Sequence, residues 1–214
     1  MRLKIYQAGE PVLRQEARSL SAEELLSPQT QQLIELMRET MRDAPGVGLA
    51  APQVGVSAQL LVIEDAVDRQ KTLPPNIVEE REYAPVPFHV IVNPRLVSAP
   101  DSRNVTFFES CLSVSGYAAM VPRAHSVRVE CLNERGDPQT INARGWYARI
   151  LQHEVDHLRG TLYVDRMHSL SLMTLDYYLL NWHARTLEES ELYFRTSGAP
   201  MDSRTNLHTF SGSP

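Results

Sequence analysis

Cysteine is scarce in this chain of 214 residues, which contains only Cys111 and Cys131. Two cysteines are too few for a disulfide framework, and we therefore expect a reducing, cytoplasmic setting. The sequence also lacks an apolar run long enough to span a membrane, and its first ten residues lack the apolar core of a secretory signal. We expect no membrane association.

A strong charge of one sign is missing as well, since 21 Lys and Arg stand against 26 Asp and Glu, a formal net charge of −5. Nucleic-acid-binding proteins usually carry a basic surface, so this balance argues against direct sequence-specific nucleic-acid binding. The remaining composition, 43% hydrophobic and 22% charged, is that of an ordinary globular protein. The length suits one good-sized domain.

Apolar residues recur at helical spacing in three stretches, which predicts helices over residues 27–43, 145–159 and 169–189. Ser27 can cap the first helix, and Pro28 suits its first turn. Gly160 stands where the second helix should end.

Short β-rich runs predict strands at residues 59–64, 88–92, 105–108, 118–121 and 126–132. The stretch 70–87 between the first two is rich in proline and charge, which favours a surface loop. Separate helices and consecutive strands indicate an α+β fold. We expect mixed, mostly antiparallel sheets packed around the central helix 145–159, with an N-terminal and a C-terminal helix.

Residues 153–157 read His-Glu-Val-Asp-His on the predicted central helix. Positions i and i+4 lie on one helix face, so His153 and His157 can direct two imidazoles at one metal ion. Glu154 lies beside the first histidine, within reach of a water molecule on that metal. This pattern is typical of metal hydrolases. The plainer alternative is a surface helix that happens to contain two histidines and two acidic residues.

A catalytic site of this kind usually needs a third protein ligand. Metzincin proteases place a histidine six residues after the second one, where this chain has Tyr163. Thermolysin-like enzymes use a downstream glutamate, and the candidates are Glu188, Glu189 and Glu191. Neither protease pattern is complete, but a zinc peptidase of another HExxH class stays an alternative.

Cys111 is a better candidate for the third ligand, because it lies upstream at the end of a strand-like run. A lone cysteine is more often a small buried hydrophobic residue. That interpretation suits Cys131, which lies within a predicted strand.

Three ordered motifs resemble those of the peptide deformylase family. Gly46 to Gln53 matches glycine-apolar-glycine-apolar-Ala-Ala-x-Gln, Glu109 to Ser113 matches Glu-Gly-Cys-Leu-Ser, and Gln152 to His157 matches Gln-His-Glu-x-Asp-His. Ser110 replaces the usual glycine of the second motif, which affects the expected local backbone conformation. The C-terminal stretch 168–214 matches no motif of the family.

The resemblance implies hydrolysis of the N-formyl group from N-terminal formylmethionine of newly made polypeptides, with release of formate. It implies one divalent metal ion, ferrous iron natively, which Zn²⁺, Ni²⁺ or Co²⁺ can replace. The implied ligands are Cys111, His153 and His157. Glu154 would move the protons, the Gln53 side chain and the Leu112 backbone N–H would meet the developing oxyanion, and Val47 and Gly48 would bind the substrate backbone.

The resemblance implies a deformylase catalytic domain over 1–167. The apolar spacing beyond it predicts a C-terminal helix, 168–194, and the Ser-, Gly-, Pro- and Thr-rich end predicts a flexible tail, 195–214. The helix can pack on the domain, mediate self-association or dock on the ribosome near nascent chains. A non-enzymatic protein that binds nascent chains is a weaker alternative, because every catalytic role has a residue. We also expect an ion pair between Glu109 and Arg123, and Asp156 either holds a histidine in its ligand tautomer or is purely structural.

Overall fold

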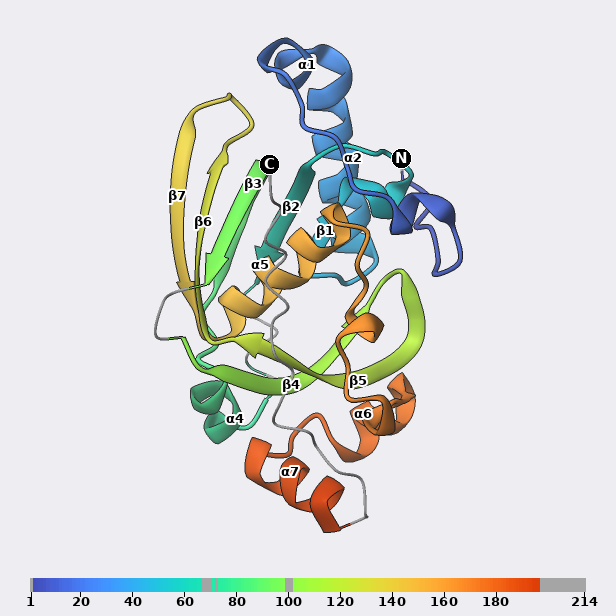
Figure 1. Ribbon diagram of the computed structural model, residues 1–214, viewed down its shortest axis with the longest axis vertical. Coiled ribbons are helices and arrows are strands. Elements are labelled where there is room, and N and C mark those ends of the chain that lie inside the picture. The colour runs from blue at the N-terminus through green and yellow to red at the C-terminus, as the bar shows by residue number, and fades with distance from the viewer. Residues whose placement is uncertain (1, 67–70, 72, 99–101, 197–214) are drawn as a thin grey trace, which may run out of the picture.

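The computed structural model describes residues 2–66, 71, 73–98 and 102–196 (Figure 1). Two antiparallel sheets form its centre, one in the order β1-β2-β3-β6-β7 and one in the order β4-β5-β8. The strands are β1 (Gly48–Ala50), β2 (Leu60–Asp65), β3 (Val86–Ser98), β4 (Asn104–Cys111), β5 (Val114–Ala124), β6 (Ser126–Leu132), β7 (Pro138–Arg144) and β8 (Met173–Thr174). Each predicted strand falls on one of these, and the α+β prediction is confirmed.

Helix α5 (Gly145–Leu158) lies between the two sheets (Figure 1) and packs on strands of both. Its apolar side chains Ile150, Leu151 and Val155 are almost fully buried in the largest core cluster. Burying each contributes about 1.5–3 kcal/mol, so packing fixes the helix firmly against the first sheet. The chain turns after α5 at Gly160, whose φ is +68° and where a Cβ would lie 2.7 Å from the Arg14 backbone. The predicted end of this helix is confirmed.

Helix α2 (Pro28–Asp43) also follows the prediction. The Ser27 hydroxyl accepts a hydrogen bond from Thr30 N–H at 3.3 Å, which caps the first turn. Ile34, Met37 and Met41 are buried against β1 and β2. The short elements before and after it are η1 (Pro11–Arg14), α1 (Ala22–Leu26) and η2 (Ala51–Val54).

The predicted surface loop 70–87 is wrong in part, because it contains helix α4 (Pro75–Glu80). Pro75 occupies the first helical turn, where proline needs no N–H partner. The Ile77 side chain is fully buried and anchors the helix. Proline and charge favoured a loop in the sequence, but one buried isoleucine is enough to hold this short helix on the domain.

The single predicted C-terminal helix is wrong. Residues 169–196 form η4 (Ser169–Ser171), strand β8, helix α6 (Leu175–Asn181) and helix α7 (Leu187–Thr196), with η3 (Tyr163–Asp165) before them. Two caps explain the interruption: the Thr174 hydroxyl accepts from Tyr177 N–H, and Thr186 exchanges hydrogen bonds with Glu189. Of the predicted tail, only the last two residues of α7 are described, and residues 197–214 lie outside the described ranges.

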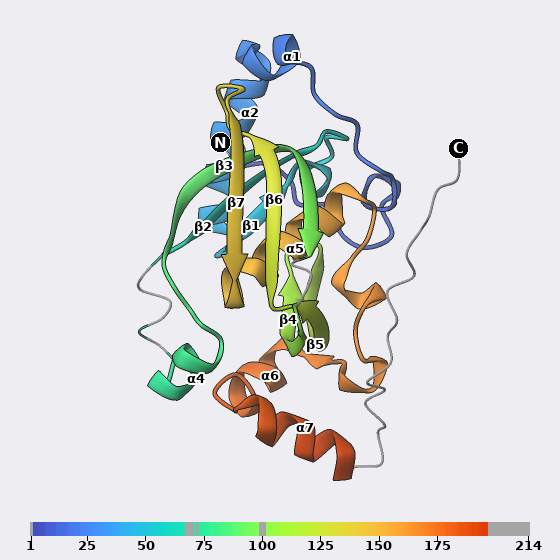
Figure 2. The same cartoon turned by 60° about the vertical axis from the view of Figure 1, so that its left-hand side comes forward.

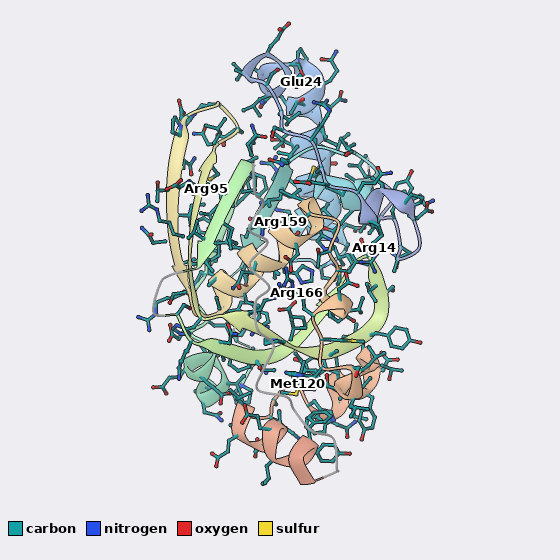
Figure 3. The ribbon with its side chains drawn as sticks, viewed as in Figure 1. Arg14, Glu24, Arg95, Met120, Arg159 and Arg166 are labelled. Atoms are coloured by element: carbon teal, nitrogen blue, oxygen red, sulfur yellow. The ribbon has the colours of Figure 1, made fainter. Side chains whose placement is uncertain are left out.

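Helices α6 and α7 lie beyond the β4–β5 hairpin, beside α4 (Figure 2). Phe108, Met120, Trp182 and Phe194 join them to the three-stranded sheet in one apolar cluster, and Figure 3 labels Met120 at this junction. In the described part of the chain, no helix has both the length and the apolar character needed to cross a membrane.

Candidate metal centre

Cys111, His153 and His157 come together in the structure, with one ligand atom of each lying within 4.8 Å of the others. Cys111 ends β4, and both histidines face it from α5. Its Sγ is 3.3 Å from His157 Nε2, and the two imidazole centroids are 5.0 Å apart. Cys111 and His157 are nearly inaccessible to solvent. The predicted ligand set is therefore assembled from two distant segments.

Glu109 orients the first histidine. His153 Nδ1 donates to Glu109 Oε2 at 2.9 Å, which leaves Nε2 free to bind a metal. Arg123 pairs with both oxygens of Glu109 at 2.9 and 3.0 Å, so the predicted ion pair is confirmed. Burial raises the pKa of Glu109, but Arg123, His153 and Arg149 outweigh burial and hold this pKa well below its ordinary value. Glu109 is therefore a fixed anion behind the cluster.

Asp156 does not hold a histidine, which corrects one of the two sequence interpretations. Its carboxylate binds Arg123 and Arg166, with contacts of 2.7 and 2.8 Å to the latter. Figure 3 labels Arg166 beside α5 near the centre of the molecule. The role of Asp156 is structural: it holds Arg123, which in turn holds Glu109.

The sulfur of Cys111 has two N–H groups directed at it. Ser113 N–H lies 3.4 Å from Sγ, and Gln53 Nε2 lies 3.7 Å from it. The Gln53 amide is oriented by Ala50 N–H, which donates to its Oε1 at 2.8 Å, so its NH₂ group faces the cluster. Hydrogen-bond donors around the sulfur suit a negatively charged thiolate ligand.

The electrostatics of the cluster fit a cation. Burial lowers the pKa of His153, but contacts with Cys111 and Glu109 outweigh it and raise this pKa well above its ordinary value. Burial, reinforced by His153, lowers the pKa of His157 well below its ordinary value. An imidazole placed between a sulfur and a carboxylate marks a position that attracts positive charge, which a metal ion would supply. The neutral His157 is already in its ligand form.

Glu154 lies next to the cluster, and its side chain is tightly packed there. Its side chain is 4% exposed, and burial raises its pKa to about 7. Its Oε2 has no hydrogen-bond partner in the described part of the chain. A Cβ on Gly48 would lie 2.3 Å from Glu154 Oε1, so only glycine at position 48 allows the carboxylate to occupy this place. A carboxyl group with a pKa near neutrality can both accept and donate a proton.

The comparison with known families agrees with this geometry. The sequence profile described as polypeptide deformylase matches residues 2–172. This chain belongs to that family. Cys111, His153 and His157 form a site of the kind in which this family holds its metal ion.

Individual deformylases are similar over most of the chain. Chloroplastic peptide deformylase 1A of Solanum lycopersicum is 42% identical over 172 residues, which cover 80% of this chain and 62% of that protein. Peptide deformylase 3 of Streptomyces avermitilis is 43% identical, with 88% of this chain and 81% of that protein covered. The chain thus spans less than two thirds of the length of the Solanum protein.

A solved deformylase has the same fold. The Met-Ala-Ser-bound crystal structure of the class I type b enzyme from Acinetobacter baumannii matches with a TM-score of 0.68 at 33% identity. The match covers 78% of this chain and 99% of that one. The zinc-peptidase alternative loses its support, because the deformylase cluster takes its third ligand from Cys111 and none from Glu188, Glu189 or Glu191 of α7.

The deformylase centre opens into a cavity of about 510 Å³. Val47, Gly48 and Leu112 all line this cavity. These three predicted residues thus border the same space as the ligands and Glu154. Ser110, the departure from the family motif, lies in a strand with an exposed side chain and does not adopt a positive φ.

Sequence reasoning missed two arginines that support the deformylase centre. Arg149 is 3% exposed and donates to Glu109 Oε1 at 2.7 Å. It lies one helical turn before His153, so its place on the same face of α5 was a usable signal. Arg166 lies outside every motif and left no such signal. The other cysteine, Cys131, lies buried in β6, where burial raises its pKa to about 11.

Proposed function

We propose that this chain hydrolyses the N-formyl group of N-formylmethionyl peptides and nascent chains, releasing formate. The observation that carries the proposal is a buried Cys/His/His cluster with Glu154 beside it, on the wall of a cavity open to solvent. The related Acinetobacter baumannii enzyme has Met-Ala-Ser bound, a peptide that begins with methionine. This supports a substrate of the same class for the present chain.

Cys111, His153 and His157 would hold one divalent ion. When bound there, such an ion lowers the pKa of a water molecule toward neutrality and polarises a carbonyl oxygen. Glu154 takes a proton from the attacking water and delivers it to the amine that leaves. Its pKa of about 7 suits both transfers.

Two donors would meet the negative charge that develops on the formyl oxygen. The Gln53 NH₂ group faces the cluster because Ala50 N–H fixes the other end of the amide. The backbone N–H of Leu112 is the second proposed donor. Loss of one such donor typically costs about 2.7–4 kcal/mol of transition-state stabilisation. Val47 and Gly48, which line the same cavity, would bind the peptide backbone of the substrate.

We propose ferrous iron as the native metal, in a cytoplasmic enzyme that can associate with the ribosome. The Cys/His/His set also accepts zinc, nickel or cobalt. Zinc has no redox chemistry, whereas ferrous iron is readily oxidised. We expect the iron-loaded enzyme to lose activity in air faster than nickel- or zinc-loaded enzyme. Half-lives measured in aerobic and anaerobic buffer test this, and equal decay of all forms would reject it.

The decisive test is formate release from a formyl-Met peptide by wild type and Glu154→Gln, both loaded with nickel. Because the amide cannot accept the proton, we expect kcat to fall about 100-fold or more, while the metal content stays the same. Glu64→Gln is the matched control and should leave activity unchanged, since the partly buried Glu64 pairs with Arg42 and is not among the residues that line the cavity. A loaded wild-type enzyme that releases no formate would reject the proposed function.

A further inference from the structure

The catalytic cavity has an open mouth through which the substrate chain must leave. An enzyme that acts on the N-terminal group of a polypeptide encloses only the chain end, so the following residues must pass the rim of the cavity. This inference rests on the proposed function. The side chains at the rim are therefore the ones that meet the residues after methionine.

The exposure of the lining residues tells which of them form this rim. Ile150 of α5 lines the interior and is 3% exposed. Tyr117 of β5 and Leu179 of α6 line the same cavity but are 47% and 50% exposed. Tyr178 lies between these extremes. The rim is thus formed on one side by α6 and the neighbouring turn of β5.

Helix α6 is held in this position by several contacts. Tyr117 pairs with Thr174 of β8, the residue just before α6. The Tyr178 ring lies 4.9 Å from that of Phe108, three residues before Cys111 on β4. After the helix, Arg81 donates to the His183 carbonyl at 3.2 Å. Through Tyr178, helix α6 therefore packs on the strand that carries the metal ligand Cys111.

The charged residues that line the cavity lie in its interior and not at its exposed rim. Five lining residues carry a formal charge, and all are at least 94% buried: Asp65, Arg81, Glu109, Arg149 and Glu154. On the side of α6, the half-exposed rim has the neutral, largely apolar side chains of Tyr117 and Leu179, whereas the exposed lining residues Ser110 and Ser115 are polar but uncharged. An apolar surface contacts an apolar side chain better than a charged one, because a charge there loses hydration without a partner.

We propose that α6, through Tyr178 and Leu179, forms a subsite for the side chain that follows the N-terminal methionine and selects apolar residues there. Helix α6 lies after residue 172, where the match to the family profile ends. The subsite is therefore a feature of this chain's C-terminal segment, and it gives the first part of that segment a role in substrate selection.

The test introduces a charge at the rim of the cavity and measures how the preference among peptide substrates changes. Formate release is measured on formyl-Met-X-Ser peptides with X as Leu, Asp or Lys. We expect wild type to prefer Leu, mainly through a lower KM. In Leu179→Asp the ratio of kcat/KM for Lys over Asp should rise about two- to fivefold, and in Leu179→Lys it should fall by the same factor, as is typical of exposed ion pairs. Turnover numbers should hardly change.

Leu180 provides a matched control on the next position of the helix. It is 84% exposed and does not line the cavity, so Leu180→Asp and Leu180→Lys should leave the ratio unchanged. Leu179→Ala, which adds no charge, should weaken the preference for Leu. An unchanged Lys-to-Asp ratio in both charged Leu179 variants, or an equal shift in the Leu180 variants, overturns the subsite. A wild type that releases formate from none of these peptides rejects the proposed function instead.

Discussion

Gly48 and Glu154 are in such close contact that a methyl group added to Gly48 would displace the Glu154 carboxylate. In Gly48→Ala the new Cβ would lie 2.3 Å from Glu154 Oε1, so the carboxylate must move. A misplacement of about 1 Å in a catalytic group can cost about 100-fold in rate. We expect kcat to fall about 10- to 100-fold with little change in metal content, measured by formate release and metal analysis.

The double variant Gly48→Ala/Glu154→Gln shows whether this loss passes through the carboxylate. If it does, adding Gly48→Ala to Glu154→Gln should cost little further activity, because the displaced group is already inactive. Independent, multiplying losses would instead assign Gly48 a separate role, such as its proposed contact with the substrate backbone.

The contacts of residues close to a motif could be predicted from the sequence. The contacts of residues that act through these residues could be predicted only in part. Glu109 and Arg123 pair as predicted, because both lie on the hairpin that carries Cys111. Asp156 has different partners from those considered, since its direction depends on how α5 is rotated against β5. Arg166 could not be found from the sequence, because it reaches Asp156 from a loop without periodicity.

At the scale of elements, the C-terminal helices are bound to the three-stranded sheet by aromatic contacts around Phe108. Trp182 is 3% exposed and its ring lies 5.9 Å from that of Phe108 on β4. Trp182→Ala should cost about 3–5 kcal/mol of unfolding free energy, as for other large buried aromatic residues. Denaturant unfolding measures this loss. Tyr177→Ala, at a position 51% exposed, should change the free energy by less than about 0.5 kcal/mol.

The shape of the denaturant unfolding curve of Trp182→Ala tests a second part of this prediction, namely whether the C-terminal helices unfold together with the sheet. A single transition at lower denaturant would show that α6 and α7 unfold together with the sheet. An unchanged main transition would contradict the prediction and make the C-terminal helices an independent unit.

Helices with capping residues and a full apolar stripe could be predicted within a residue or two. Helix α2 has both Ser27 and Pro28, and α5 has Gly160 behind it. Helices α4, α6 and α7 are six to ten residues long, too short for a periodic signal to separate them from loops or from one another. Their positions depend on tertiary contacts, such as the bond of 2.9 Å from Leu187 N–H to Glu80.

For the whole molecule, the metal site joins two layers, the three-stranded sheet and the layer formed by α5 with the five-stranded sheet. Cys111 belongs to the three-stranded sheet, whereas His153 and His157 belong to the helix that packs on the five-stranded sheet. Separating these layers on unfolding would destroy the site. A bound ion must therefore stabilise the native chain, by about 2.7 kcal/mol at a free concentration 100 times the dissociation constant.

For a protein of this length, a stabilisation of that size raises Tm by about 5–10 °C, since each kcal/mol shifts it by about 2–4 °C. The two cysteines supply the comparison, with Tm measured in the presence of nickel and of a chelator. Cys111→Ser should lose most of the nickel-dependent shift, because a hydroxyl is a poor substitute for a thiolate. Cys131→Ser, in β6 and outside the cluster, should keep the full shift even if its own Tm is lower. Equal shifts in both variants would mean that the ion does not bridge the layers through the sulfur, and the ligand set would have to be reassigned.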